Sequence, residues 1–268
     1  MEFKELRLDL EATVSEALFG HGYAHYGYWP HAPTNDLTAE ALGKAQQAYV
    51  DVLAARIPKG TRTILDVGSG TGANARELCR LGYEMECLSP SAHMNALARA
   101  KLSQGVKVHT TTFETFECDR TFDLCLFAES FHYIDLDAAL RQLARYAASS
   151  VLIFDYFRKT RAKAGGTRTT HDAFLQALSA QGDFEIVSDE DLTQQILPTF
   201  QVLDRIKNAY VGPFVSRTRR ALESSYPLRM KLAQLFIGKA LDKIEKPSRR
   251  AATFPQNFEY RLILLRRR

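Results

Sequence analysis

The stretch LDVGSGTG, residues 65–72, contains residue types suited to holding a ligand, because an aspartate precedes three glycines at alternate positions. The run TILDV, residues 63–67, predicts a buried strand that ends there. Glycines after a strand let the backbone approach a ligand closely, and the start of the next helix offers free N–H groups to an anionic group. Asp66, two residues before Gly68, would repel a pyrophosphate but would attract an ammonium group. These residues predict a site for a nucleotide-like cofactor.

Two other kinds of glycine-rich loop fit less well. No Lys-Ser or Lys-Thr pair follows the glycines, which argues against a phosphate-cradling P-loop. Gly68, Gly70 and Ala73 do satisfy the relaxed dinucleotide pattern G-x-G-x-x-G/A. The acid that this pattern places about 20 residues later is missing, since the second predicted strand ends in Leu88 and Ser89. NAD or NADP is therefore the weaker alternative.

The stretch AESFHYID, residues 128–135, contains side chains that could move a proton. It follows a predicted strand, and ligands bind outside the carboxyl ends of parallel strands. His132 could accept a proton near neutral pH, and Tyr133 could orient an acceptor. Asp155, at the end of the next predicted strand, is a second candidate. A single histidine can also simply pack or cap beneath a loop, so both interpretations stay open. We expect no metal site.

These side chains must be positioned by alternating strands and helices. The helices are predicted over residues 73–82, 89–105, 136–147 and 170–182. The strands are nearly continuously apolar, which is typical of a parallel sheet covered on both faces. We predict an α/β, doubly wound, mostly parallel, seven-stranded Rossmann-like sheet. Its strands are expected at residues 63–67, 83–88, 106–110, 121–127, 150–157, 183–188 and 258–265.

Two segments do not fit a plain sheet with covering helices. Residues 1–60 are predicted to form an N-terminal helical lid, interrupted by the glycine- and aromatic-rich HGYAHYGYWP. Residues 190–252 are too long for a connection without structure of their own, and we expect a helical cap insert that shapes the substrate pocket. The cofactor-binding core is then formed by residues 61–189 and 253–268.

The acid and glycines of residues 66–72 resemble the first motif of the class I S-adenosylmethionine-dependent methyltransferases, an acid followed by G-x-G-x-G. The resemblance extends over roughly residues 60–190. It implies that S-adenosylmethionine is the cofactor, that the acid holds the methionine ammonium group, and that the glycines pack against the cofactor. It also implies that Ala128 and Glu129 line the methionine end. In the glycine loop, the residues that it assigns to the cofactor are Asp66, Gly68, Ser69, Gly70 and Gly72.

Two positions depart from the pattern of this family. Its members usually have an acid at the end of the second strand for the ribose hydroxyls, and the matching residue here is Ser89. An acid near the end of the third strand usually receives the adenine amino group, and the matching residue is Thr112, followed by Phe113. A hydroxyl binds these groups more weakly than a carboxylate. Cofactor affinity could therefore be modest, or Glu86 or Glu114 could substitute.

The N-terminal stretch HGYAHYGYW, residues 21–29, resembles a segment of small-molecule methyltransferases related to the sterol, tocopherol and cyclopropane-forming groups. The stretch DLTQQILPT, residues 191–199, resembles the segment that follows their sixth strand. In that group the N-terminal element closes over the cofactor, so the resemblance makes Tyr26, Tyr28 and Trp29 lid candidates. Aromatic rings there would exclude water and could contact the sulfonium group. Packing of the segment on the sheet explains some of them equally well.

The composition is that of an ordinary globular protein. The chain has 268 residues, of which 46% are apolar and 25% charged, which excludes collagen-like, wholly disordered and disulfide-scaffold classes. The four cysteines form no C-x-x-C pair, and buried thiols in a reducing cytosol are the expected state. No apolar run approaches the length of a membrane span and no signal peptide is apparent, so we expect a cytoplasmic protein.

The net charge of +4 is unevenly distributed. Residues 201–268 contain 16 Lys and Arg and 5 Asp and Glu, a net +11, so residues 1–200 carry −7. A basic C-terminal quarter could attract an anionic substrate, a nucleic acid or a membrane surface, or it could simply be a solvated face. The stretch at residues 226–246 has apolar residues at helical spacing with Lys and Arg between them. It could pack in the core or cap, or bind a membrane surface or partner.

These observations favour a methyltransferase that acts on a small molecule, with an anionic acceptor made attractive by the basic insert. One alternative is an RNA or protein methyltransferase that docks through the basic C-terminal quarter. The sequence AESF after the fourth strand is not the tetrad typical of base-directed enzymes, so we do not expect a nucleic acid partner. A non-catalytic binding protein with the same fold is a further alternative, as is other chemistry with the same cofactor. Substrate, acceptor atom and oligomeric state are not readable from the sequence.

Overall fold

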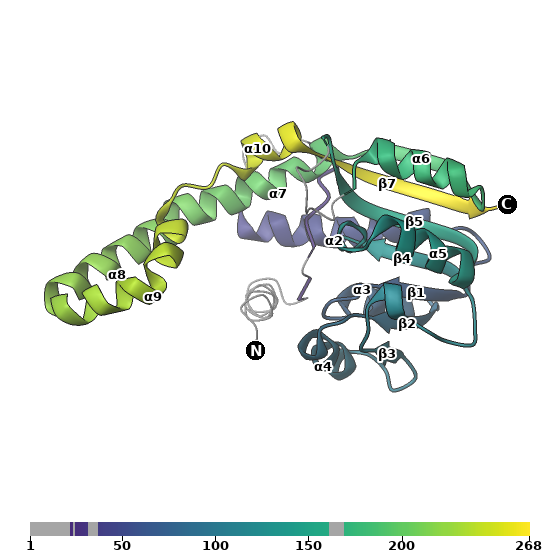
Figure 1. Ribbon diagram of the computed structural model, residues 1–268, viewed down its shortest axis with the longest axis horizontal. Coiled ribbons are helices and arrows are strands. Elements are labelled where there is room, and N and C mark those ends of the chain that lie inside the picture. The colour runs from purple at the N-terminus through teal and green to yellow at the C-terminus, as the bar shows by residue number, and fades with distance from the viewer. Residues whose placement is uncertain (1–21, 24, 32–36, 161–168) are drawn as a thin grey trace.

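The computed structural model describes residues 22–23, 25–31, 37–160 and 169–268. In this part of the chain, seven strands form one sheet in the order β3-β2-β1-β4-β5-β7-β6 (Figure 1). β7 runs antiparallel to β5 and β6, and the other neighbours are parallel. The predicted mostly parallel, Rossmann-like sheet is therefore confirmed. The strands are Thr63–Val67 (β1), Glu84–Leu88 (β2), Lys107–His109 (β3), Phe122–Ala128 (β4), Ala147–Arg158 (β5), Phe184–Asp191 (β6) and Phe258–Arg267 (β7).

Helices cover both faces of this sheet, because alternate residues of each strand point to opposite sides. In β1, Leu65 belongs to a core that includes Leu143 of α5 and Phe174 of α6. Its neighbour Ile64 belongs to a second core on the other face, with residues of α2, α3, α7 and α10. The helices are Ala39–Arg56 (α2), Ala73–Arg80 (α3), Ala92–Lys101 (α4), Leu136–Tyr146 (α5), His171–Gln181 (α6), Thr193–Ile206 (α7), Gly212–Ser225 (α8), Pro227–Glu245 (α9) and Arg250–Asn257 (α10).

Capping residues explain why the predicted helix boundaries are close to the observed ones. The side chains of Ser91, Asp135 and Thr170 accept hydrogen bonds from backbone N–H groups in the first turns of α4, α5 and α6. Such caps satisfy donors that have no partner within the helix. Gly82 follows α3 with a φ of +94°, the left-handed conformation that glycine adopts without strain.

The N-terminal segment is helical only in part. α2 confirms a helix in the predicted lid, but residues 22–23 and 25–31 contain no helix and form an irregular strap, which we call the N-terminal strap. Residues 1–21 lie outside the described residues. The strap lies against α2, since the Tyr28 N–H donates to the carbonyl oxygen of Ala45 at 2.8 Å.

The predicted insert differs from expectation at its start and in its middle. β6 continues to Asp191, paired with Arg261 of β7, so the insert begins with α7 at Thr193 and not at residue 190. α7 and α10 pack against each other and against β7. The five-residue π-helical turn Lys207–Val211 (η3) connects α7 to α8.

Of the helices that begin within residues 190–252, α7 and α10 pack on the body, and the cap role predicted for this segment stays a prediction. α8 and α9 pack on each other and form a hairpin that projects away from the sheet, here called the arm (Figure 1). The arm buries almost none of its side chains against the body, which is why it stands apart from it. No helix in the described ranges is long and apolar enough to cross a bilayer.

Candidate functional site

The site residues predicted from the sequence gather at the carboxyl ends of β1, β4 and β5. These strands are neighbours in the sheet, with Val67 paired with Phe127 and Ala128 paired with Phe154. Asp66 is the second-to-last residue of β1, Glu129 directly follows β4, and Asp155 lies in β5. This edge of a parallel sheet is where α/β proteins bind ligands.

The glycine loop between β1 and α3 has the backbone that only glycine adopts freely. Gly68, Gly70 and Gly72 have φ values of +79°, +54° and +74°. At Gly68 a Cβ atom would lie 2.3 Å from the Cβ of Ser130, so the loop also needs glycine there for close packing against the chain after β4. Gly70 has open space where a side chain would be, which leaves its backbone accessible to a ligand.

Asp66 is a buried carboxyl group with an unsatisfied oxygen. Only 1% of the residue is exposed, and its Oδ2 has no hydrogen-bond partner. Burial raises the pKa of this carboxyl from 3.8 to about 7. A buried acceptor without a donor is costly, and a ligand that brings a cationic donor would satisfy it. The chemistry of this position fits an ammonium group, as the family resemblance implies.

Glu129 is held in an unusual backbone conformation at the end of β4. Its φ is +59°, the left-handed region that a residue with a side chain adopts rarely. Its Oε1 accepts hydrogen bonds from the Tyr26 N–H at 2.8 Å and from the Tyr260 hydroxyl at 2.7 Å. Burial raises the pKa of Glu129 to about 8, although these two hydrogen bonds oppose the shift. Ala128 precedes it as the last residue of β4.

Tyr260 is a site residue that the sequence analysis missed. It lies in β7, 131 residues from Glu129 along the chain, and it is fully buried. The signal that could have identified it is the alternation in the last strand, where Tyr260 is an inward-facing position next to buried Leu262.

His132 and Asp155 form a buried pair. The Nδ1 of His132 lies 2.8 Å from Asp155 Oδ1, and the His132 backbone N–H donates to Oδ2 at 3.1 Å. Asp155 is completely buried and His132 is 7% exposed. Because a carboxylate only accepts, it holds the proton on Nδ1 and leaves Nε2 with its lone pair. His132 Nε2 is buried and has no hydrogen-bond partner.

Aromatic rings enclose this histidine. The ring of Tyr156 stacks on His132 with centroids 4.2 Å apart, and the ring of Tyr133 lies 3.8 Å away. Tyr133 is 52% exposed, so it forms the outer side of this group. Packing of this kind fixes the orientation of the imidazole. The arrangement does not distinguish whether Tyr133 also contacts an acceptor, so that role stays a prediction.

The N-terminal strap lies over the same edge of the sheet. The Tyr26 ring packs on Phe200 of α7 with centroids 4.7 Å apart. Thr199 Oγ1 accepts hydrogen bonds from the Gly27 N–H and from Trp29 Nε1, each at 3.0 Å. Trp29 is buried, whereas Tyr28 is partly exposed. The strap is thus fastened to α7 through residues that sequence analysis assigned to a lid.

The strap also reaches the glycine loop. Thr71 Oγ1 donates to the carbonyl oxygen of Gly22 at 2.9 Å, and His25 Nε2 lies 3.0 Å from Asn74 Oδ1 in α3. The side chain of His25 stacks on Tyr49 of α2. A change in the position of the strap would therefore be felt directly by the loop.

The positions that depart from the family pattern lie farther along the same edge. Ser89 is buried after β2, with its N–H donating to the His109 carbonyl oxygen at 3.1 Å. Thr112 is exposed and its hydroxyl lies 3.0 Å from that of Thr115. The Phe113 ring is buried in the core against Phe127, so its side chain has a packing role.

The two acids suggested as substitutes are engaged elsewhere. Glu86 lies 2.8 Å from His109 Nε2 and within 3.4 Å of Lys107 and Arg120, which makes it part of an ion-pair network. Glu114 Oε1 accepts a 3.4 Å contact from the backbone N–H of Asp135. Glu86 is therefore held by several cationic partners, whereas Glu114 has one long contact.

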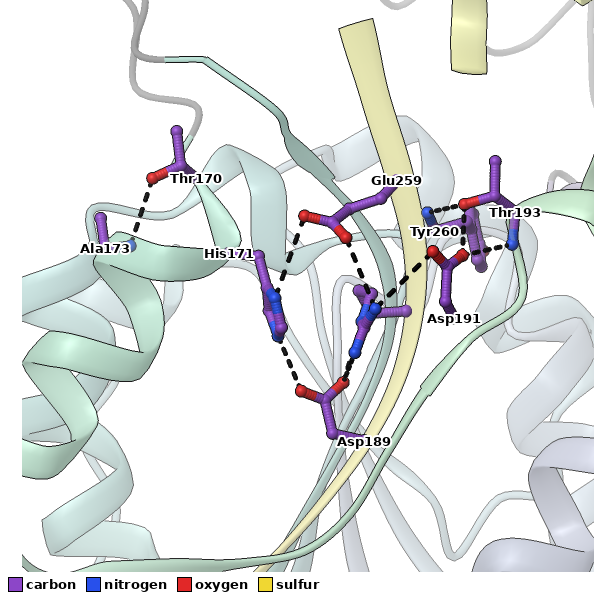
Figure 2. A network of polar contacts seen from close by, with 9 residues as sticks. Thr170, His171, Ala173, Asp189, Asp191, Thr193, Glu259 and Tyr260 are labelled. Atoms are coloured by element: carbon purple, nitrogen blue, oxygen red, sulfur yellow. Dashed lines mark hydrogen bonds and ion pairs between the residues drawn. The ribbon is translucent and has the colours of Figure 1, made fainter. Parts of the chain in front are cut away.

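A polar network supports the strand that carries Tyr260 (Figure 2). His171 Nε2 lies 2.8 Å from Asp189 Oδ2, and Arg261 forms an ion pair with the other oxygen of Asp189 at 2.7 Å. Next to it, the Tyr260 N–H donates to Thr193 Oγ1, whose hydroxyl donates to Asp191. These contacts join α6, β6, α7 and β7. They fix Tyr260, whose hydroxyl holds Glu129.

The described residues around the site include no cluster of metal ligands. Within the described ranges of the chain, no group of three or more His, Cys, Asp or Glu residues is arranged to hold a metal ion.

Comparison with known protein families gives a match over part of the chain. Residues 64–150 match the family described as a methyltransferase domain. An uncharacterized methyltransferase of Bacillus cytotoxicus is 27% identical over 99 residues, which are 37% of this chain and 47% of that protein. The chain thus matches less than half the length of this curated relative.

Comparison with solved structures extends over nearly the whole chain. The [4+2]-cyclase SpnF has a TM-score of 0.68 at 18% identity, with 98% of this chain and 94% of that chain covered. Geranyl diphosphate C-methyltransferase from Streptomyces coelicolor has a TM-score of 0.66 at 16% identity, with 96% and 92% covered. At such identities the likeness is one of fold. It agrees with the sheet described above.

Proposed function

We propose that this chain, whose core is a class I methyltransferase domain, is an S-adenosylmethionine-dependent methyltransferase that acts on a small molecule. We further propose that its acceptor atom carries a proton that must be removed, as a hydroxyl group does. The observation that carries this proposal is the buried His132–Asp155 pair, whose Nε2 is unpartnered at the carboxyl edge of the sheet.

The residues of the glycine loop fit the cofactor. Asp66 would receive the methionine ammonium group, because its Oδ2 is buried and lacks a donor. Gly68, Ser69, Gly70 and Gly72 would lie along the cofactor, with the open side of Gly70 toward it. We propose that Ser89, Thr112 and Phe113 lie toward the nucleoside, and Ala128 and Glu129 toward the methionine end. Geranyl diphosphate C-methyltransferase was solved with S-adenosyl-L-homocysteine, which supports this cofactor for a chain of the same fold.

The chemistry that the cofactor supplies is an electrophilic methyl group, so the protein must mainly align an acceptor and remove its proton. Asp155 keeps the His132 proton on Nδ1 and orients the ring. His132 Nε2 can then accept the proton of an acceptor hydroxyl, and Asp155 stabilises the imidazolium that results. The rings of Tyr156 and Tyr133 pack against the imidazole and fix its plane.

The strap would close this site from solvent. Tyr26 contacts Glu129 through its backbone and Phe200 through its ring, and we propose that it excludes water from the reacting atoms together with Tyr28. The aromatic surroundings favour an acceptor with apolar parts. The charge does not favour an anionic acceptor, since many of the cations that suggested one lie on the arm, away from the site (Figure 1).

Cofactor binding is the first test. We expect purified, cofactor-free protein to bind S-adenosylmethionine in calorimetric titration with micromolar affinity and to show no heat with NAD. A folded sample that binds neither ligand would contradict the proposal and favour a non-catalytic protein of the same fold. A [4+2]-cyclase has a similar fold, so cofactor binding is to be followed by an assay of methyl transfer itself.

The proton transfer is tested by His132→Ala. With an acceptor found by screening hydroxylated small molecules, we expect turnover to fall by about 10² to 10⁴ while the Kd for S-adenosylmethionine stays within about twofold. Asp155→Asn should lower turnover as well, and His31→Ala, at an exposed position, is the matched control. Turnover that is unchanged in His132→Ala would remove this residue from the mechanism.

A further inference from the structure

We propose that the arm formed by α8 and α9 docks on an anionic lipid bilayer surface. Several large apolar side chains of the arm are highly exposed. Leu228, Leu232, Leu235 and Phe236 of α9 are 84%, 62%, 78% and 82% exposed. Exposed apolar patches of this kind usually mark an interaction surface. This inference does not depend on the methyltransferase activity.

The four residues lie on one face of α9 because they are spaced by four, three and one positions. The same face continues with Lys239 and Lys243, each four residues beyond the previous member of the row. The apolar half of the face is therefore followed directly by a basic half.

The face of α9 that packs against α8 buries very little of its side chains. The only buried residue of α9 is Gly238, and the neighbouring Gln234 donates to Glu223 of α8 at 2.6 Å. In an ordinary surface helix the large apolar side chains would be on the packed face. Here the packed row holds Gly238 and Gln234 with only partly buried Met230 and Leu241, whereas the four most exposed apolar residues of α9 face outward. The outward face is thus the one suited to a further partner.

The charge of the arm indicates the nature of that partner. Residues 212–246 contain eight Lys and Arg and three Asp and Glu. Arg219 contacts all three acids, with Glu223 at 3.0 Å, Asp242 at 2.7 Å and Glu245 at 3.2 Å. One arginine therefore pairs with all three acids, and the arm as a whole has a net charge of +5, which gives it a positive field. That field is complementary to anionic lipid headgroups.

A bilayer fits this surface better than a second copy of the chain. In a two-fold contact through the same face, Lys239 and Lys243 would face their own copies if the helices ran parallel and apolar side chains if they ran antiparallel. Neither arrangement gives these cations an opposing charge. The tip of the arm carries Tyr226, with the Arg229 guanidinium 5.9 Å from its ring centroid, next to Leu228. Aromatic, aliphatic and basic side chains together are typical of helices that lie in a lipid interface. The arm also extends beyond the body, so a flat surface can reach it (Figure 1).

The test is sedimentation of the purified full chain with vesicles of phosphatidylcholine alone or with 30% phosphatidylglycerol. We expect binding to the anionic vesicles that falls steeply as salt is raised, and at least tenfold weaker binding to the neutral ones. Leu235→Ser/Phe236→Ser and Lys239→Glu/Lys243→Glu should each weaken anionic binding at least tenfold, since one basic residue contributes roughly fivefold. The matched control is Leu81→Ser/Val187→Ser, which removes exposed apolar residues of the body.

Circular dichroism and cofactor affinity of each variant verify that it is folded. Absence of vesicle binding by the unaltered chain would overturn the proposal, as would equal binding by the arm variants and the control. Loss of a dimer in the apolar arm variant, seen by analytical ultracentrifugation without any effect on vesicles, would assign the face to a second copy instead. Loss of salt-sensitive capture of an acidic protein, again without vesicle binding, would assign it to a protein partner.

Discussion

Asp66 and Glu129 are carboxyl groups that the fold buries at a free-energy cost. Burial raises the pKa of Asp66 to about 7 and that of Glu129 to about 8. Glu129 is partly compensated by the Tyr260 hydroxyl and the Tyr26 N–H, whereas one oxygen of Asp66 has no donor at all. Buried polar groups that lower the stability of the free protein and lack hydrogen-bond partners are typical of binding sites.

The cost at Asp66 gives a prediction about stability and pH. Because the folded-state pKa is raised, the folded chain holds a proton that the unfolded chain releases between about pH 4 and pH 7. The contribution of Asp66 to stability therefore falls as pH rises through this window and is constant above it. In Asp66→Asn we expect this part of the decline to disappear. Between pH 5 and pH 8 the free energy of unfolding should then fall about 2 to 4 kcal/mol less than in the unaltered chain.

Urea unfolding at these two pH values measures the effect, without ligand present. Asp119→Asn, at an exposed carboxyl group, is the matched control and should follow the unaltered chain. If Asp66→Asn and the unaltered chain showed the same pH dependence, ionisation of Asp66 would not lower the stability of the folded chain.

At the scale of elements, one hydroxyl makes several of the contacts between the strap and α7. Thr199 Oγ1 receives both the Gly27 N–H and Trp29 Nε1, which are 172 and 170 residues away along the chain. The hydroxyl itself donates to the Gly27 carbonyl oxygen at 3.2 Å. All these groups are buried, so each would be costly to leave without a partner.

Thr199→Val keeps the shape of the side chain and removes the hydroxyl. We expect a loss of about 2 to 4 kcal/mol in the free energy of unfolding, because two buried donors lose their acceptor. Trp29 is the single tryptophan of the chain, so a shift of its fluorescence emission would report a loosened strap directly. Thr199→Ser retains the hydroxyl and should restore most of both values. Unaltered emission and stability in Thr199→Val would show that this bond does not hold the strap.

At the scale of the whole molecule, the body and the arm differ in how they are stabilised. The strands β1, β4 and β5 are almost entirely buried between two helical layers. In α8 and α9 the only buried residues are Gly212 and Gly238. Local opening requires least free energy where few apolar contacts are lost.

We therefore expect hydrogen exchange to divide the molecule into two classes. Backbone amides of α8 and α9 should exchange at least 100-fold faster than those of β1, β4 and β5 in the free chain. Mass spectrometry of peptides from both regions measures this difference, and α5, which is amphipathic and packed on the sheet, is the internal control. Equal protection of the arm and α5 would mean that the arm is stabilised by contacts beyond its own hairpin.

Much of the sheet could be predicted from the sequence, since its signals are local. β1 was predicted at its observed bounds, and the other strands within a few residues, because buried strands are apolar and their ends are marked by glycine or polar residues. The glycine loop and Asp66 were identified for the same reason. The end of β6 was predicted three residues too early, since its last residues are polar. Asp191 pairs with Arg261 of β7, and Asp189 forms an ion pair with the same arginine.

The sequence by itself determined the αβ alternation, the glycine loop and the candidates His132 and Asp155. Only the tertiary structure decided that these two residues are bonded to each other, that Tyr260 holds Glu129, and that α8 and α9 leave the body. The physical reason is distance along the chain. Local propensity and periodicity act over one helix or strand, whereas Tyr260 and Glu129 are 131 residues apart and meet only because β7 is inserted beside β5. Which face of α9 is packed likewise depends on its partner helix, and its own periodicity does not reveal that.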